Sequence, residues 1–207
     1  MLGNFIATRL KRRGPQSLLA AQTHFDLGVR LLADGFYPKA LVQLKLATRE
    51  NPDHAEAWLE LGRTLQKMGQ LAKAIKAYLS ALKVRPNFVT AQKDLGAAYD
   101  DQGDFVKALK VYTRAIILAP QDPDLRIDLG LAYFNIGSYA EAKKAFRQAL
   151  DLDPQNARAH YCMGLVYLDL EEKEKALAQH SQLEAWNEKH LAFKLLDKIE
   201  RQTQQPS

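Results

Sequence analysis

Histidine and cysteine, the side chains best suited to metal binding or nucleophilic chemistry, are few and scattered in this sequence. The 207 residues include five histidines and one cysteine: His24, His54, His160, His180, His190 and Cys162. A metal site needs several converging donors, and no two of these residues have the short spacing of a metal motif. The chain also lacks a phosphate-binding glycine loop and a nucleophile elbow. We therefore predict a noncatalytic protein with no catalytic residue, no metal and no cofactor.

Composition and charge indicate an ordinary folded protein. The chain is 47% hydrophobic and 26% charged, and it has no apolar stretch of the roughly 18 residues that a membrane helix needs. Residues 1–20 lack the apolar centre of a secretory signal, so we expect a cytoplasmic location. Four units of the net charge of +5 come from Arg9, Lys11, Arg12 and Arg13. The rest of the chain is nearly neutral, which argues against a nucleic-acid partner.

A repeat of 34 residues dominates the sequence. A Leu-Gly or Met-Gly step recurs at residues 27–28, 61–62, 95–96, 129–130 and 163–164, and a later glycine recurs as Gly35, Gly69, Gly103 and Gly137. A repeat of this length determines the fold and must be identified first. The register predicts five units, which are residues 21–54, 55–88, 89–122, 123–156 and 157–190.

Each unit has the apolar spacing of two helices joined by a tight turn. Gly69 suits the left-handed residue that ends the first helix. Gly62 lies inside that helix, where glycine costs roughly 1 kcal/mol relative to alanine. We expect this glycine to allow close approach of the partner helix, with the small residues Ala74 and Ala81 facing it. Proline steps such as Arg85-Pro86 then end the second helices.

This pattern resembles the tetratricopeptide repeat family from residue 21 to about residue 186. The resemblance implies an all-α, right-handed superhelical solenoid of antiparallel helix pairs. The first and fifth units depart from the pattern at their aromatic positions, as end units do. An apolar stripe of Trp186, Phe193, Leu196 and Ile199 predicts a capping helix over residues 187–203, followed by a disordered tail at 204–207. Residues 1–20 are interpreted as a basic N-terminal extension.

In this family the first helices line a concave groove, and the resemblance carries that role over by repeat position. The candidate groove residues are Phe25, Asp26, Val29, Leu59, Glu60, Arg63, Lys93, Asp94, Ile127, Asp128, Leu131, Tyr161 and Leu165. The sixth residues of four units form a ladder of carboxylates, Asp26, Glu60, Asp94 and Asp128, which we expect to be exposed. Such a ladder can also persist without function, because like charges ~10 Å apart in water repel by only ~0.4 kcal/mol.

The resulting hypothesis is a protein-binding scaffold or adaptor whose acidic and apolar groove takes a basic, amphipathic segment of a partner. The carboxylate clamp known in this family is not matched, because its asparagine positions hold Val29, Arg63, Ala97, Leu131 and Leu165. The alternative is an assembly factor recruited to a membrane surface by residues 1–20. Those residues fit a targeting segment, a membrane anchor, a groove ligand that supports self-association, or disorder. Lysines on the second helices fit a solvated surface or weak docking to an anionic one.

Overall fold

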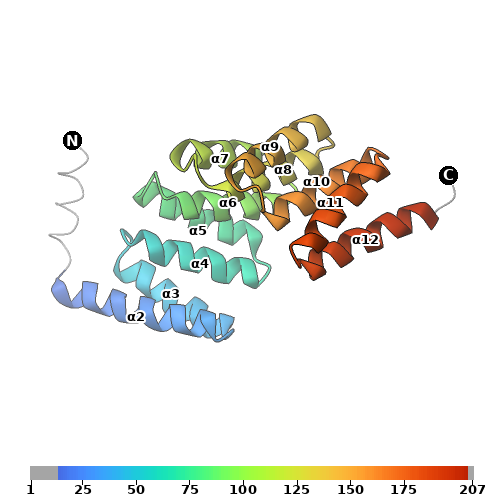
Figure 1. Ribbon diagram of the computed structural model, residues 1–207. Coiled ribbons are helices and arrows are strands. Elements are labelled where there is room, and N and C mark those ends of the chain that lie inside the picture. Colours follow the sequence, from blue (N-terminus) through green and yellow to red (C-terminus); the bar gives the residue numbers. More distant parts are fainter. Residues whose placement is uncertain (1–13, 205–207) are drawn as a thin grey trace. The chain divides into compact units, whose positions relative to one another are not determined.

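The computed structural model describes residues 14–204, and this part of the chain is entirely α-helical with no strand (Figure 1). The helices are α2 (Pro15–Ala33), α3 (Tyr37–Glu50), α4 (Ala55–Lys67), α5 (Leu71–Val84), α6 (Val89–Asp101), α7 (Phe105–Leu118), α8 (Pro123–Asn135), α9 (Tyr139–Leu152), α10 (Ala157–Asp169), α11 (Lys173–Ala185) and α12 (Lys189–Gln204). Two compact units divide the chain after Gln102, with α2 to α6 in unit 1 and α7 to α12 in unit 2. The predicted all-α repeat fold is confirmed.

In unit 1 the helices pack in chain order, each against the next. The first helices of successive repeats also touch, α2 with α4 and α4 with α6. The turn between the helices of each hairpin is a left-handed glycine, Gly35 at φ 77° and Gly69 at φ 71°, as the repeat predicted. An L-residue at these positions would strain the backbone.

The glycines inside the first helices have the steric reason that we expected, and at Gly62 and Gly130 the close neighbour is an aromatic ring, whereas at Gly28 and Gly164 it is a leucine. A Cβ added to Gly62 would lie 2.4 Å from Cε1 of Tyr78, whose side chain is fully buried. Gly130 in unit 2 stands in the same relation to Phe146, at 2.5 Å. The missing Cβ therefore makes room for a ring of the second helix, while Ala74 and Ala81 fill other buried positions.

The fourth residue of three repeats lies within hydrogen-bond distance of the proline turn that ends the preceding repeat. Ring or amide nitrogens of Trp58, Gln92 and His160 lie 2.8, 3.0 and 3.1 Å from the carbonyl oxygen of the proline six residues earlier. Three different residue types thus hold the inter-repeat turn in the same way.

In unit 2, α12 packs against α10 and α11, close to the predicted range for the capping helix. Its buried residues are Ala192, Leu195 and Ile199, whereas Phe193 is 71% exposed. The prediction that Phe193 belongs to the buried stripe is therefore wrong. Trp186 is not part of this helix but the C-cap of α11. The turn at Asn187, with φ 60°, starts α12 at residue 189 and sets a different face inward.

The first helix begins earlier than the first repeat. Gly14 is its N-cap and Pro15 its first residue, so residues 15–20 of the segment interpreted as an extension are helical. Residues 1–13 and 205–207 lie outside the described part of the chain. Between Gly14 and Gln204, none of the helices combines the length and the apolar character needed to cross a bilayer.

Candidate functional site

A hollow lies in unit 1, on the side formed by its first helices. Its volume is about 840 Å³. The lining residues are Val29, Leu32, Ala33, Tyr37, Glu60, Arg63, Gln66, Lys67, Tyr78, Asp94, Ala97 and Asp101. They come from α2, α4 and α6, together with one tyrosine each from α3 and α5. We call this hollow the unit 1 groove.

The two sides of the unit 1 groove differ in chemistry. The side formed by α2 is apolar, with Val29, Leu32 and Ala33, and Tyr37 at the start of α3 continues it. Val29 is 37% exposed although it is aliphatic. The opposite side, on α4 and α6, carries the charged groups. Mostly apolar walls with a few convergent polar groups are typical of binding sites.

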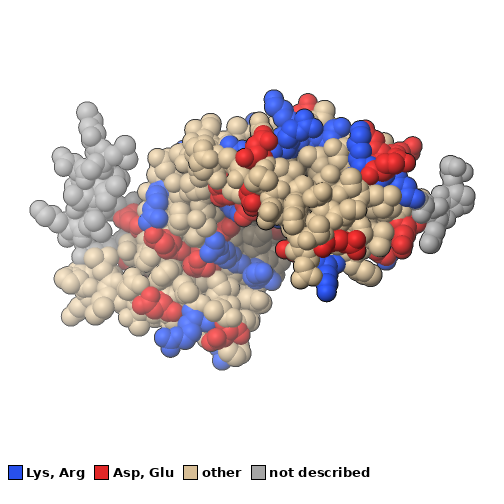
Figure 2. All heavy atoms as spheres, in the orientation of Figure 1, with Lys and Arg blue, Asp and Glu red and all other residues tan. Residues whose placement is uncertain are grey.

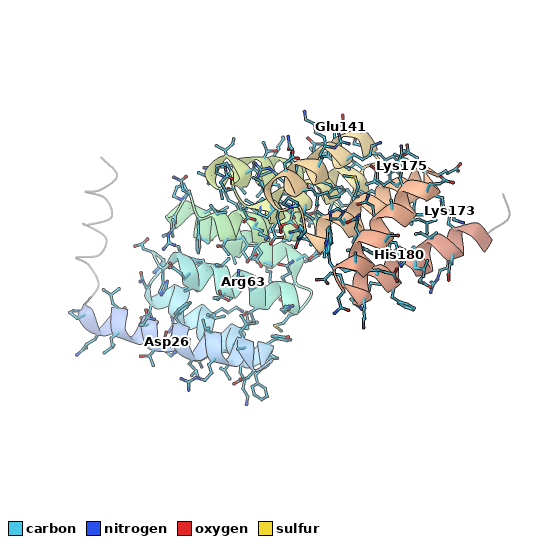
Figure 3. The ribbon with its side chains drawn as sticks, viewed as in Figure 1. Asp26, Arg63, Glu141, Lys173, Lys175 and His180 are labelled. Atoms are coloured by element: carbon cyan, nitrogen blue, oxygen red, sulfur yellow. The ribbon has the colours of Figure 1, made fainter. Side chains whose placement is uncertain are left out.

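An arginine between two carboxylates is the centre of the charged side. Nε of Arg63 donates to Oδ2 of Asp94 at 2.6 Å, and its Nη1 donates to Oε1 of Glu60 at 2.9 Å (Figure 3 labels Arg63 on α4). Burial opposes the charge of Arg63, but the bonds to Asp94 and Glu60 outweigh it and raise the pKa of the guanidinium. Burial raises the pKa of Glu60, and Arg63 only partly offsets this. Nη2 of Arg63 makes neither of these bonds and can donate to a ligand.

A second set of hydrogen bonds in the groove lining joins α5, α4 and the end of α6. The Tyr78 hydroxyl donates to Oε1 of Gln66 at 2.8 Å, and Nε2 of Gln66 donates to Oδ2 of Asp101 at 2.6 Å. Burial, with nearby carboxylates, raises the pKa of Tyr78, so its hydroxyl stays protonated. These bonds fix the amide of Gln66 and one carboxylate oxygen of Asp101, which is an exposed residue of the groove lining.

The structure brings four of the predicted unit 1 residues together and separates the others. Val29, Glu60, Arg63 and Asp94 all line the unit 1 groove. Leu59 is 4% exposed, so the expectation that it faces a partner is wrong. Its place in the helix period puts it on the α4 face that contains Ala55 and Gly62, which packs against neighbouring helices.

The remaining unit 1 candidates lie away from the groove lining. The Phe25 ring packs against the His54 ring, with centroids 4.6 Å apart. Asp26 is exposed on α2 (Figure 3) and accepts a hydrogen bond from Gln22 at 2.8 Å. Lys93 is partly buried on α6.

In unit 2 two of the candidates are buried, which corrects the expectation that they are exposed. Ile127 has no exposed surface, and the Asp128 side chain is 10% exposed. Oδ1 of Asp128 accepts from Nη2 of Arg158 at 2.6 Å. Asp128 is inaccessible because its neighbours on α10 cover it and Arg158 neutralises it.

The other unit 2 candidates are partly exposed. Leu131 and Tyr161 pack against the buried cluster around Phe146. Leu165 lines a second, smaller hollow of about 420 Å³ together with Phe134, Leu168, Asp169, Asp197, Lys198, Arg201 and Gln202. One wall of this hollow is formed by α12, in the place that the first helix of another repeat would take.

The predicted ladder of exposed carboxylates is therefore interrupted by arginines. Arg63 pairs with the sixth residues of its own and the next repeat, and Arg158 pairs with that of the preceding repeat. Figure 2 shows acidic and basic side chains interleaved over α4 and α6. Sequence reasoning missed these pairs, and it also missed Leu32, Tyr37, Gln66 and Tyr78 as groove residues, whereas Asp101 stands at a repeat position that the family resemblance places in the groove. The ion pairs between successive repeats could have been found from the spacing of an arginine and a carboxylate by 30 or 31 residues. This spacing is shorter than the 34-residue repeat by about one helical turn, so the two side chains lie next to each other on adjacent first helices.

Comparisons with known proteins give one consistent family. Profiles described as tetratricopeptide repeat match residues 25–65 and 59–123, residues 95–166, and residues 136–199. No curated protein matches the sequence. Among residues 14–202 there is also no group of three or more side chains that could hold a metal ion.

Solved structures with the same fold include three bacterial-type repeat proteins. MamA from Desulfovibrio magneticus is 24% identical with a TM-score of 0.69, covering 90% of this chain and 98% of that one. A thermophilic TPR protein from Thermus thermophilus is 27% identical with a TM-score of 0.68, covering 87% and 99%. YrrB, described as a TPR protein with an unusual peptide-binding site, is 22% identical with a TM-score of 0.67, covering 84% and 90%.

Proposed function

Because the chain belongs to the tetratricopeptide repeat family, whose members are scaffolds for protein interaction, we propose that its unit 1 groove binds a basic, amphipathic segment of a protein partner. The role is noncatalytic. The partner's apolar side chains contact Val29, Leu32 and Ala33, and its Lys or Arg side chains face the carboxylates of α4 and α6.

The observation that carries this proposal is the pairing of an apolar wall with an excess of carboxylate in one hollow. The lining holds three acids, Glu60, Asp94 and Asp101, against two bases, Arg63 and Lys67. One positive charge from a ligand neutralises the net charge of the lining, whereas a negatively charged ligand adds to its excess of negative charge. A volume of about 840 Å³ also falls within the range of roughly 300 to 1,000 Å³ seen for ligand pockets.

The groove is preorganised for such a partner. Glu60, Arg63 and Asp94 hold one another, and Tyr78 and Gln66 hold Asp101. Side chains that are already fixed lose little further entropy on binding. Opposite charges across the interface chiefly select the partner and speed its association, while the apolar contacts supply most of the affinity.

The test uses two synthetic peptides with the same leucine positions, one with lysine and the other with glutamate between them. Fluorescence anisotropy with the full chain should show binding of the lysine peptide and much weaker binding of the glutamate peptide. Asp101→Asn should weaken the lysine peptide up to about fivefold, which corresponds to the roughly 1 kcal/mol at the upper end for an exposed ion pair. Val29→Glu should weaken both peptides, because it places a charge on the apolar wall.

Asp26→Asn is the matched control, since it removes the same charge from another first helix, α2, at a position outside the groove lining. Its affinity should equal that of the unchanged protein. The proposal fails if the two peptides bind equally, or if Asp26→Asn and Asp101→Asn have the same effect.

A further inference from the structure

The second helices of unit 1 carry an unusual set of side chains on their outer faces. The positions are residues 19, 22, 25 and 29 of each repeat, which we call the outer quartet. The outer quartets of the first two repeats are Lys39, Val42, Lys45 and Arg49 on α3, and Lys73, Lys76, Leu79 and Lys83 on α5. All eight residues are exposed. They comprise six cations, two aliphatic residues and no acid.

Helix geometry sets these quartets on the face opposite the core. On α3 the buried residues are Ala40, Leu44, Ala47 and Thr48, and Val42 lies half a turn from Leu44. Both α3 and α5 pack against α4. The outer quartets therefore point away from the packed helices of unit 1 and do not belong to the unit 1 groove.

Most of these cations have no carboxylate to neutralise them within residues 14–202. Arg49 pairs with Glu50 at 3.2 Å, and Lys73 donates to the amide oxygen of Gln70 at 2.8 Å. Lys45, Lys76 and Lys83 form no ion pair with a described residue. Their ammonium groups are consequently available to an anionic surface.

The charge of unit 1 is strongly separated between these faces. Residues 14–102 contain eleven Lys and Arg and nine Asp and Glu. Six of the bases and none of the acids are in the outer quartets. All other positions together hold five bases and nine acids, so a nearly balanced unit has basic outer faces on α3 and α5 and an acidic remainder.

The pattern is not a general property of the repeat. In the third repeat the same four positions are Lys107, Lys110, Thr113 and Ile117, with two cations where each of the first two repeats has three. In the fourth they are Glu141, Lys144, Arg147 and Asp151, and in the fifth Lys175, Ala178, Ser181 and Ala185. Acidic and small residues at these exposed positions are therefore equally compatible with the fold. The basic composition in unit 1 needs another explanation.

We propose that the outer quartets of α3 and α5 form a docking surface for an anionic lipid membrane. Five of the six cations are lysines, which are depleted at protein interfaces and which make no planar, base-specific contacts. A lysine instead extends its ammonium group along a flexible apolar stem, a geometry suited to a headgroup layer. Val42 and Leu79 are 55% and 46% exposed among the cations. Burying these two aliphatic side chains at the boundary between lipid headgroups and acyl chains is favourable, whereas contact with the phosphate backbone of a nucleic acid would bury no apolar surface.

Phe36, the N-cap residue of α3, places an aromatic ring beside Lys39 of the α3 quartet. It is 53% exposed, and the Lys39 ammonium lies 5.2 Å from its ring centroid. An exposed aromatic ring beside a lysine is typical of membrane-interface segments. Attachment is reversible, because such contacts are far weaker than an inserted helix.

The experiment is flotation of the full chain with phosphatidylcholine vesicles that either contain or lack phosphatidylserine. Wild type should float only with the anionic vesicles, and high salt should release it, since the Debye length falls from about 10 Å at 0.1 M to about 3 Å at 1 M. Each cation near an anionic surface strengthens binding about fivefold. Lys45→Gln with Lys76→Gln should therefore weaken binding roughly 25-fold. Circular dichroism should be unchanged, because both side chains are exposed.

Lys173→Gln with Lys194→Gln is the matched control, because it removes two exposed lysines from unit 2 and should leave flotation nearly unchanged. Equal losses in the two double variants would overturn the proposal by indicating net charge alone. Unchanged flotation of the unit 1 variant would place the binding elsewhere, for example in residues 1–13. Tighter binding to a polyuridine RNA than to the anionic vesicles, with loss in the unit 1 variant, would identify nucleic acid instead.

Discussion

The contact between α12 and α10 predicts which residue of the last helix holds unit 2 together. Leu195 is fully buried, and its Cδ2 would lie 2.6 Å from a Cβ built on Gly164. The side chain thus occupies space that α10 leaves open by having a glycine there. Phe193, two residues earlier, is larger but points into solvent. Leu195→Ala and Phe193→Ala are therefore expected to differ sharply in their effect on the free energy of unfolding.

The magnitude follows from two contributions. Burying a leucine side chain contributes about 1.5 to 3 kcal/mol, and a cavity adds to the loss when the surroundings cannot collapse. Gly164 has no side chain that could fill the space, so collapse is limited on that side. We expect Leu195→Ala to cost about 3 to 4 kcal/mol, within the usual range for buried Leu→Ala changes. Phe193→Ala should change stability by less than about 0.5 kcal/mol, as exposed substitutions do.

Urea denaturation followed by far-UV circular dichroism measures both variants. Trp186 fluorescence, in a Trp58→Phe background, reports unit 2 separately, because its indole ring packs on His160 with centroids 4.8 Å apart. Repeat proteins lose their terminal elements first when nearest-neighbour coupling fails, so the Trp186 signal should move to lower urea in Leu195→Ala. If Phe193→Ala proves as damaging as Leu195→Ala, the inward face assigned to α12 is wrong.

Three further predictions concern buried groups. Gly62→Ala should lose about 2 kcal/mol, because overpacking against the Tyr78 ring costs up to about 3 kcal/mol while alanine regains about 1 in helix propensity; an unchanged urea midpoint would contradict this. Burial raises the pKa of the Cys162 thiol to about 12, so thiol titration with a disulfide reagent at neutral pH should be slow until urea unfolds unit 2; rapid labelling of the native protein would show that the site opens locally. The raised pKa of Glu60 means that the folded state holds this proton more tightly than the unfolded state, whose value is near 4.5. The stability of wild type relative to Glu60→Gln should therefore be constant below that pH and should fall as the pH rises through the folded pKa, as urea titrations at several pH values can test.

The architecture could be predicted from the sequence because the same turn and helix-ending residues recur at the same positions in successive repeats. Turn glycines such as Gly69 and helix-ending prolines such as Pro86 favour the same local backbone conformation wherever they recur. The end of the array was harder to predict. After Gly164 the glycine and proline signals stop, and the phase of α12 depends on the turn at Asn187, which an asparagine indicates far more weakly than a glycine.

The groove was predicted less well because exposure depends on the angle at which neighbouring helices pack. Leu59 and Ile127 occupy the same repeat position as Phe25, yet both are buried whereas Phe25 is partly exposed. Phe25 lies on α2, the first helix that the structure describes, whereas Leu59 lies on α4, which packs against α2, α3, α5 and α6. A fixed list of repeat positions therefore overestimates exposure in the middle of an array and is most reliable at its end.

The arginines explain how the chain can carry carboxylates at four sixth positions without an exposed acidic strip. Arg63 bonds both Glu60 and Asp94, and Arg158 bonds Asp128, so most of this charge is internal to the array and helps to join successive repeats. Breaking a well-buried pair is expensive because the partner charge is left behind, and reversing Asp128 would place two cations together on unit 2. What is offered to a partner is the smaller excess at the rim of the unit 1 groove, above all Asp101. Specificity for a basic segment, if it is found, should consequently follow the rim carboxylates and the apolar wall of α2 rather than the number of acidic residues on the first helices.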